Sequence, residues 1–276
     1  MGAGASRNGD KQIQRLSEAE KESIVVIPKA DQDTCVDTMV RCFCGYGTAP
    51  EFALDFIFWP LKDGEIFQPL PQNSDGSFAQ NPDHEACFRW IFKYCLKEIN
   101  HTGLTFGIKK EDGKGYAALA LVRPPGHKET MTSSIRAAMG VGTTPLWEEK
   151  KGAGNEKFVQ TKIRQDEIQK AMTKCHKECC PEKHWYVYML HVDPAYQGKK
   201  YGKRLLNMIL GLADRDGVPT YLECVGDRNI AIYEKFGFKV IKKYPVLVGM
   251  EDKIGGPPLT EGGGLTGMKR HPVKQT

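Results

Sequence analysis

The feature that most constrains the fold is a change of pattern along one stretch of the chain, from strand to loop to helix. Residues 185–192 are dense in aromatic and β-branched side chains, as a buried strand requires, and Asp193 and Pro194 end them. A loop containing glycine and lysine follows, and apolar positions then recur at helical spacing from Leu205 to Ala213. Such a loop directs backbone N–H groups and a helix N-terminus at one point, which suits a pyrophosphate.

A second strand and helix follow this unit directly. Residues 220–225 predict another strand, and a short helix carries apolar residues as far as Phe236. Gly237 stands where helices commonly end, and residues 239–247 predict a final strand.

The first half of the chain gives weaker signals of the same mixed kind. The predicted elements are a strand over 24–27, a helix capped by Asp31 or Asp33, a helix capped by Asp83, a hairpin over 104–108 and 116–122, and a helix with Ile168, Met172, Cys175 and Cys179 on one stripe. Residues 123–156 are punctuated by Pro and Gly and predict an insertion with short helices. We therefore predict one domain over residues 23–276.

The composition argues against several classes of protein. No apolar run among the 276 residues is long enough to span a membrane, and the N-terminus lacks the apolar core of a secretory signal. Nine cysteines without such a signal predict free thiols in a reducing compartment, and hence a cytoplasmic protein. The net charge of +5 is too small and dispersed to indicate a nucleic-acid partner.

Residues 1–22 are polar and predict a flexible tail. Gly2 after the initiator Met1, with Ser6 four residues later, matches the pattern of N-myristoylation. One acyl chain gives only weak, reversible membrane binding, so the expected protein partitions between cytosol and membrane.

Residues 184–240 resemble the cofactor-binding half of the GNAT superfamily of N-acetyltransferases. The letters VDPAYQGKKYGKRLL are similar to its pyrophosphate loop, and NIAIYEKFGFKV is similar to its second signature. The wider run most resembles the puromycin-acetyltransferase-like branch. One departure is Lys200, which stands where the family's loop normally has glycine.

The resemblance implies an α/β (α+β) fold with a mixed, mostly antiparallel central sheet flanked by helices. It implies acetyl-CoA as cofactor and transfer of its acetyl group to a primary amine. The implied cofactor contacts are Leu190, His191 and Val192 for the pantetheine arm, Gln197, Gly198, Lys199, Lys200, Tyr201, Gly202 and Lys203 for the pyrophosphate, and Asn229 for the pantetheine or as a helix cap. Tyr233 resembles the general acid that protonates the leaving thiolate, the alternative being a core aromatic.

The general base is left open between two residues. Strand alternation places Glu223 on one face with Tyr221 and Val225. A mid-sheet carboxylate indicates either a base or an ion pair with a nearby lysine. His191 is the second candidate, the alternative being that it only packs beside the strand.

A cluster of thiols and imidazoles precedes the strand over 185–192. Its members are Cys175, His176, Cys179, Cys180 and His184. It lacks the paired spacing of structural zinc sites, and the helical stripe explains two of its cysteines as buried core thiols. We predict no bound metal.

A small-molecule amine is the predicted acceptor. The alternatives are a protein N-terminus or lysine, a catalytically silent acyl-CoA-binding module, and a zinc-organised interaction protein.

Overall fold

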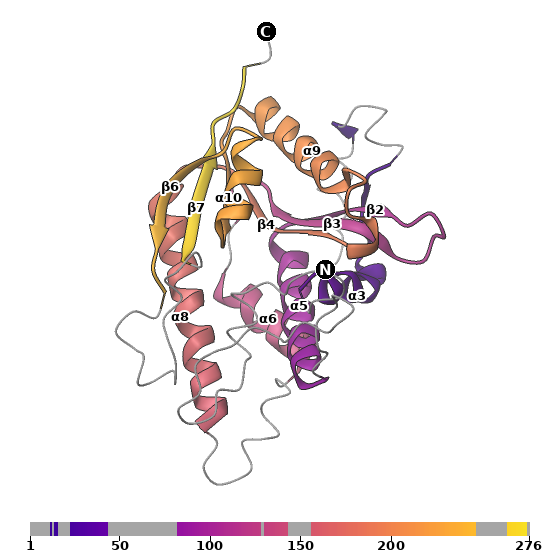
Figure 1. Ribbon diagram of the computed structural model, residues 1–276, viewed down its shortest axis with the longest axis vertical. Coiled ribbons are helices and arrows are strands. Elements are labelled where there is room, and N and C mark those ends of the chain that lie inside the picture. The colour runs from indigo at the N-terminus through magenta and orange to yellow at the C-terminus, as the bar shows by residue number, and fades with distance from the viewer. Residues whose placement is uncertain are drawn as a thin grey trace.

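The computed structural model describes residues 12, 14–15, 23–43, 82–127, 130–142, 156–246 and 264–274 (Figure 1). Gly2 and the rest of the myristoylation pattern lie outside the described residues. The glycines near 45–47, expected to end the first helix, also lie outside them.

Within the described residues, seven strands form one sheet in the order β1-β2-β3-β4-β5-β7-β6. Their bounds are β1 Val25–Val26, β2 Leu104–Lys109, β3 Tyr116–Arg123, β4 Trp185–Val192, β5 Thr220–Cys224, β6 Lys239–Tyr244 and β7 Leu265–Arg270. All neighbouring strands run antiparallel except β4 and β5, which are parallel. The predicted mixed, mostly antiparallel sheet is confirmed.

Helices cover both faces of this sheet. The helices are α3 Gln32–Phe43, α5 Pro82–Thr102, α6 Met131–Val141, α8 Glu156–Cys179, α9 Tyr201–Asp216 and α10 Asp227–Glu234. Figure 1 shows α9 on one side of the strands and α3 and α5 on the other, with α8 beside β7 and β6. The architecture is therefore helix, sheet, helix, which buries both faces of the central strands.

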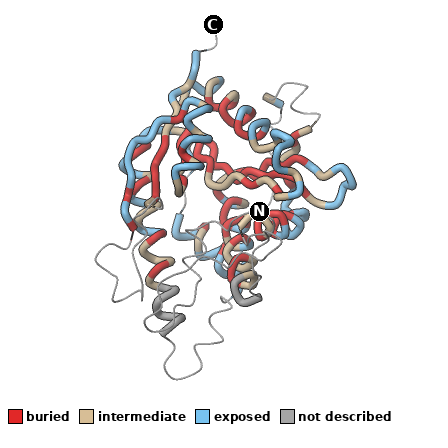
Figure 2. Tube along the Cα trace, in the orientation of Figure 1, coloured by how far each residue is buried: buried red, intermediate tan, exposed pale blue. Residues whose placement is uncertain are grey.

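Each face of the sheet contributes to a separate apolar core. Leu119 and Leu121 of β3 pack toward α3, α5 and α8, whereas Ala118 and Ala120 pack toward α9. This alternation is the period of a pleated strand, and it leaves β3 buried along its whole length (Figure 2).

Two details differ from the sequence-based expectations. Helix α5 begins at Pro82, so Asp83 lies in its first turn and is not its cap. Strand β7 was not predicted, and it lies between β5 and β6. Only glycine fits at its central position 267, because a Cβ there would lie 2.7 Å from the sulfur atoms of Cys175 and Cys179.

Candidate functional site

Strands β4 and β5 separate soon after they meet. They pair only at Trp185 with Thr220 and at Tyr186 with Tyr221. A bulge between β3 and β4 follows, because Leu121 pairs with Met189 while Val122 pairs with Val187. Beyond this bulge, residues 188–190 of β4 are only partly buried, so the strand has an open edge in the middle of the sheet.

The ladder between β3 and β4 decides which backbone groups point to that open edge. The N–H of Asp193 donates to the carbonyl oxygen of Ala117 at 2.9 Å. In an antiparallel ladder alternate residues face the partner strand, so His191 faces β3 while Leu190 and Val192 face away from it. The backbone groups of His191 thus point toward β3, and its expected contact with the pantetheine arm stays a prediction. The carbonyl of Val192 already accepts a hydrogen bond from the Cys42 thiol at 3.1 Å.

The open edge leads to the start of α9. Lys200 precedes this helix with φ 64° and ψ 17°, and its side chain makes no capping hydrogen bond. The first backbone bond of the helix runs from Arg204 N to Lys200 O at 3.0 Å. The N–H groups of Tyr201, Gly202 and Lys203 consequently point out of the helix start.

Lys200 is the only non-glycine residue with positive φ among the described residues. It occupies the position where the resemblance implies glycine, so the family's backbone geometry is kept with a lysine in it. A left-handed conformation costs an L-residue roughly 1 kcal/mol. The side chain is exposed to solvent.

Two glycines shape the loop before α9 for different reasons. Gly198 has φ 80°, and a Cβ added to it would meet nothing within 4 Å, so conformation is what requires glycine there. A Cβ at Gly202 would come within 3.0 Å of the Val192 side chain. The helix start therefore lies against the end of β4.

Asp193 fixes the beginning of the same loop. Its buried carboxylate accepts a hydrogen bond from Ala195 N at 3.0 Å and forms ion pairs with Lys110 at 2.9 Å and Arg41 at 3.3 Å. Burial raises the pKa of Asp193, but these contacts outweigh it and hold the pKa below its usual value. Beyond it, Lys199, Lys200 and Lys203 are exposed around the helix start. The charge near the loop is therefore mostly positive.

Glu223 of β5 lies on the face that the alternation predicts, beside Tyr221. The hydroxyl of Tyr186 donates to its Oε2 at 2.6 Å, while its buried Oε1 has no hydrogen-bond partner. Burial raises the pKa of Glu223 to about 7, although the phenols of Tyr186 and Tyr221 and the charge of Arg123 lower it. Among the described residues no ion pair with a lysine is found for Glu223, so the structure does not support that alternative.

His191 is poorly suited to be the base. Its ring is 1% exposed, and neither nitrogen has a hydrogen-bond partner. The rings of Phe43 and Phe92 lie edge-on to it at centroid distances of 5.0 and 5.9 Å. Burial lowers the pKa of His191 to about 3, so the imidazole is neutral and holds a proton weakly.

Tyr233 and Asn229 lie on α10. The ring of Tyr233 packs against Phe238 at 5.8 Å in the α9-side core, and burial raises its pKa above the usual value. The phenol therefore keeps its proton at neutral pH. Asn229 is in the third position of α10, whose N-cap is Gly226, and its amide donates to Val225 O at 2.9 Å. The expectation that Asn229 caps this helix is wrong.

The thiol and imidazole cluster forms pairs and not a ligand set. Cys175 accepts a hydrogen bond from Tyr221 at 3.3 Å and lies 3.9 Å from Cys179, and both cysteines are buried as predicted. Nε2 of His176 lies 2.6 Å from Nε2 of His184. Within the described parts of the chain, no group of three or more metal-ligating side chains is found.

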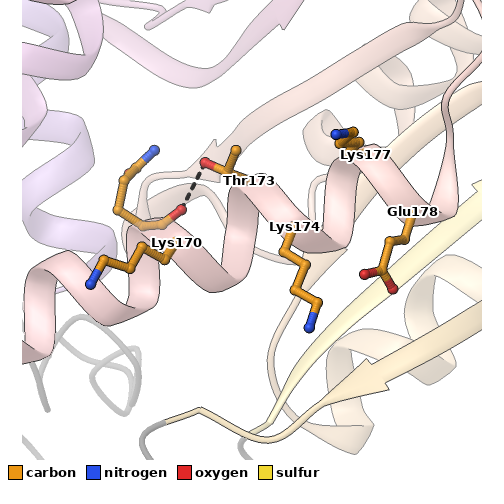
Figure 3. A pocket seen from close by; sticks show the side chains of 6 residues that line it. Lys170, Thr173, Lys174, Lys177 and Glu178 are labelled. Carbon is orange, nitrogen blue, oxygen red and sulfur yellow. Dashed lines mark hydrogen bonds between the residues drawn. The ribbon is translucent and has the colours of Figure 1, made fainter.

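A shallow hollow on α8 contains none of the predicted site residues. It is lined by Gln169, Lys170, Thr173, Lys174, Lys177 and Glu178. Figure 3 shows that its three lysines leave the helix at different angles and do not converge on one point. The dashed line there is the bond from the Thr173 hydroxyl to the backbone oxygen of Gln169.

The sequence around the splayed strands matches a known family. Residues 158–238 fit the acetyltransferase (GNAT) family, a range that contains β4, the loop, α9, β5 and α10. Over these residues the chain is similar to the GNAT acetyltransferases. Among the helices that the structure describes, none is long and apolar enough to cross a membrane.

One curated relative and several solved structures are similar to this chain. An uncharacterized N-acetyltransferase of Schizosaccharomyces pombe is 41% identical over 54 residues, which is 20% of this chain and 22% of the relative. The match thus spans about a fifth of that relative's length.

The C-terminal condensation domain of Ebony, solved with beta-alanyl-dopamine, has a TM-score of 0.50 at 8% identity, covering 90% of this chain and 97% of that one. Arylalkylamine N-acetyltransferase 2 from Aedes aegypti has a TM-score of 0.47 at 17% identity, covering 90% and 97%. At such identities the likeness concerns the fold alone.

Proposed function

We propose that this protein is an N-acetyltransferase that moves an acetyl group from acetyl-CoA to a primary amine. The observation that carries the proposal is the continuity of the open β4 edge with the uncapped start of α9. An extended amide-containing chain and a pyrophosphate need those two surfaces end to end. The GNAT match over the same residues supports it.

The pantetheine arm and the pyrophosphate of acetyl-CoA each have residues suited to hold them. The backbone of Leu190 and the N–H of Val192 would bind the pantetheine amides, since no described strand pairs with that edge. The segment from Gln197 to Lys203 would hold the pyrophosphate through backbone N–H groups, with the lysine side chains around it adding positive charge. Lys199, Lys200 and Lys203 are the cations in question.

We assign the proton transfers to two side chains, Glu223 of β5 and Tyr233 of α10. Acetyl-CoA supplies an activated thioester. Glu223 accepts the proton that the amine nitrogen loses, for which a carboxyl pKa of about 7 is well matched. Tyr233 gives its proton to the sulfur that leaves, because its raised pKa keeps the phenol neutral until then.

A small-molecule amine is the acceptor we propose, within the puromycin-acetyltransferase-like branch. We propose further that the protein is cytoplasmic and that Gly2 is myristoylated, so that part of it binds membranes weakly. Mass spectrometry of the N-terminus after expression in a eukaryotic host tests the lipid. An unmodified or acetylated Gly2 throughout would contradict it and leave the catalytic proposal intact.

Calorimetry with acetyl-CoA tests the cofactor site. We expect wild-type protein to bind, and Gly198→Val to bind more weakly because a β-branched residue strains a backbone at φ 80°. Gly126→Val is the matched control, since Gly126 has φ 84° and equally open surroundings but lies outside the proposed site. Absence of wild-type binding at about 1 mM cofactor, an affinity near 4 kcal/mol, would reject the proposal.

Turnover of Tyr233→Phe, measured as thiol release over a panel of amines, tests the chemistry. We expect turnover to fall by roughly 10- to 1000-fold with acetyl-CoA affinity retained. Tyr244→Phe is the control, because the hydroxyl of Tyr244 hydrogen-bonds to Glu178 on α8. Equal turnover in wild type and Tyr233→Phe, with chemistry rate-limiting, would remove Tyr233 from the mechanism.

A further inference from the structure

The carboxylate of Glu223 is held at one oxygen and not at the other. Its Oε2 accepts the hydrogen bond of Tyr186 at 2.6 Å, whereas its Oε1 is buried and has no partner. A buried oxygen without a hydrogen bond is costly, so such an arrangement indicates an atom that meets a donor from outside the protein.

Tyr186 is itself fixed by a buried ion pair. The guanidinium of Arg123 lies 5.5 Å from the centre of the Tyr186 ring and 4.7 Å from that of Tyr188. Arg123 binds Glu98 at 2.7 Å and donates to Thr102 at 3.2 Å. Arg123 and Glu98 are 5% and 1% exposed, so this pair has little freedom to move.

The other groups around Glu223 provide weaker control of its proton. From β5, the phenol of Tyr221 also lowers the pKa of Glu223, but less than that of Tyr186 does, and its hydroxyl donates to Cys175 at 3.3 Å. From α8, burial raises the pKa values of Cys175 and Cys179, so both thiols are neutral. The ring of His176 stacks on Tyr221 at 4.8 Å.

His184 completes the imidazole pair on this side of Glu223. Its Nδ1 lies 2.6 Å from the carbonyl oxygen of Glu182, so Nδ1 carries the proton and Nε2 accepts from His176. Among the charged groups, the buried Arg123 lowers the pKa of Glu223 and so favours its ionised form.

We propose that Tyr186 is a positioning residue for acetyl transfer: its phenol fixes Oε2 of Glu223, directs Oε1 to the acceptor amine, and favours the ionised carboxylate. Arg123 holds the phenol in place. The inference rests on the proposed role of Glu223 as base. Tyr186 thus acts through Glu223: it sets the pKa of the base and so the pH range in which the base is ionised.

The sign of the effect follows from the hydrogen bond. A phenol that donates to a carboxylate stabilises the charged form, so removing it raises the pKa of Glu223. A lost bond to a charged group corresponds to a rise of about one pH unit.

The direct test is a ¹³C NMR titration of glutamate-labelled protein, with the Glu223 signal assigned from its loss in Glu223→Gln. We expect Tyr186→Phe to move the Glu223 midpoint upward by about one pH unit. Tyr188→Phe is the matched control, because its ring also lies under Arg123 but its hydroxyl contacts Cys95 at 3.3 Å. The Glu223 midpoint should stay where it is in that variant.

A fluorinated tyrosine at position 186 gives the opposite sign. Its more acidic phenol is a stronger donor, so the midpoint of Glu223 should fall. This variant also decides the matter if Tyr186→Phe does not fold, because it keeps the size and the hydroxyl of the side chain.

Acetyl transfer gives the functional arm of the test. In Tyr186→Phe the acidic limb of the pH–rate profile should move to higher pH. Turnover should therefore fall at pH 7 and recover near pH 9. An unchanged Glu223 midpoint in Tyr186→Phe, or an equal shift in Tyr188→Phe, would overturn the positioning role. A wild type that transfers no acetyl group would reject the proposed function, while the NMR titration would still decide whether Tyr186 controls Glu223.

Discussion

Helices α6 and α9 begin in opposite ways. At α6, the Thr130 hydroxyl accepts from Ser133 N at 3.1 Å, and the Ser133 hydroxyl accepts from Thr130 N at 2.9 Å. This capping box satisfies the N–H groups of the helix start from within the chain. At α9, Lys200 offers no side-chain hydrogen bond and holds a strained conformation.

The contrast separates a helix end that serves the fold from one that is available to a ligand. The start of α9 receives no capping hydrogen bond from Lys200, so its N–H groups and positive dipole end suit an anion. A chain selected for stability alone would place Ser, Thr, Asp or Asn at position 200. The start of α9 breaks two local rules at once, since it lacks a side-chain cap and holds a left-handed lysine, and such failures are typical of functional sites.

The largest effect on the contrast between α9 and α6 is expected at Gly202. We expect Gly202→Val to weaken acetyl-CoA binding by roughly 10- to 100-fold, because the side chain would push the start of α9 away from Val192 at a cost of about 1–3 kcal/mol. Calorimetry measures this. Gly140→Val in α6 is the control, since a Cβ there meets only the flexible stem of Lys97 at 3.6 Å, and its binding should equal that of wild type.

Asp193 tests whether the α9 start depends on its anchor. Asp193→Asn should lower the free energy of unfolding by about 2 kcal/mol at pH 7, less than for a fully buried pair because Lys110 and Arg41 are partly exposed.

The pH dependence of that loss has a definite sign. The pKa of Asp193 is lower in the folded state, so its contribution is present above the unfolded pKa of about 3.9 and disappears as pH falls through the folded pKa. Urea unfolding at pH 7 and pH 3 should show the gap between the two proteins closing at acid pH. A gap that persists at pH 3 would contradict the ionic role.

Thr130→Ala addresses the closed helix start. Loss of the cap should cost about 1 kcal/mol of stability, since the N–H of Ser133 loses its partner. Acetyl-CoA affinity should not change. A weaker affinity in this variant would show that α6 and α9 do not divide structure and binding as the comparison implies.

Lys200→Gly should give the smallest effect. Removing the left-handed lysine should stabilise the protein by somewhat less than about 1 kcal/mol. Lys203→Gly is the control of opposite sign, because a glycine within α9 costs about 1 kcal/mol. Thermal unfolding of both variants distinguishes strain at Lys200 from a general effect of lost charge.

The parts of the site that follow from local pattern were predictable. The aromatic and β-branched run at 185–192 coincides with β4, and the alternation that grouped Glu223 with Tyr221 holds in the structure. Both depend on strand periodicity, which neighbouring residues determine between them.

The rest depends on contacts between distant segments. The separation of β4 from β5, the hydrogen bond from Tyr186 to Glu223 and the isolation of His191 by Phe43 and Phe92 join residues far apart in the chain. Strand β7 is similar, because Gly267 at its centre is explained only by the sulfur atoms of α8. No periodicity within these segments reports such contacts.

The short pairing of β4 with β5 also has a mechanical consequence. Strands β1 to β4 are joined to strands β5, β7 and β6 by two residue pairs between β4 and β5, so pairing across the middle of the sheet is weak. A bound molecule whose amides pair with the open edge would act as an added strand and join the two halves of the sheet. The free energy of unfolding would then rise with the concentration of the bound molecule, by about 2.7 kcal/mol at a hundred times its Kd. Without it, the exposed strand edge remains a place where another chain can pair.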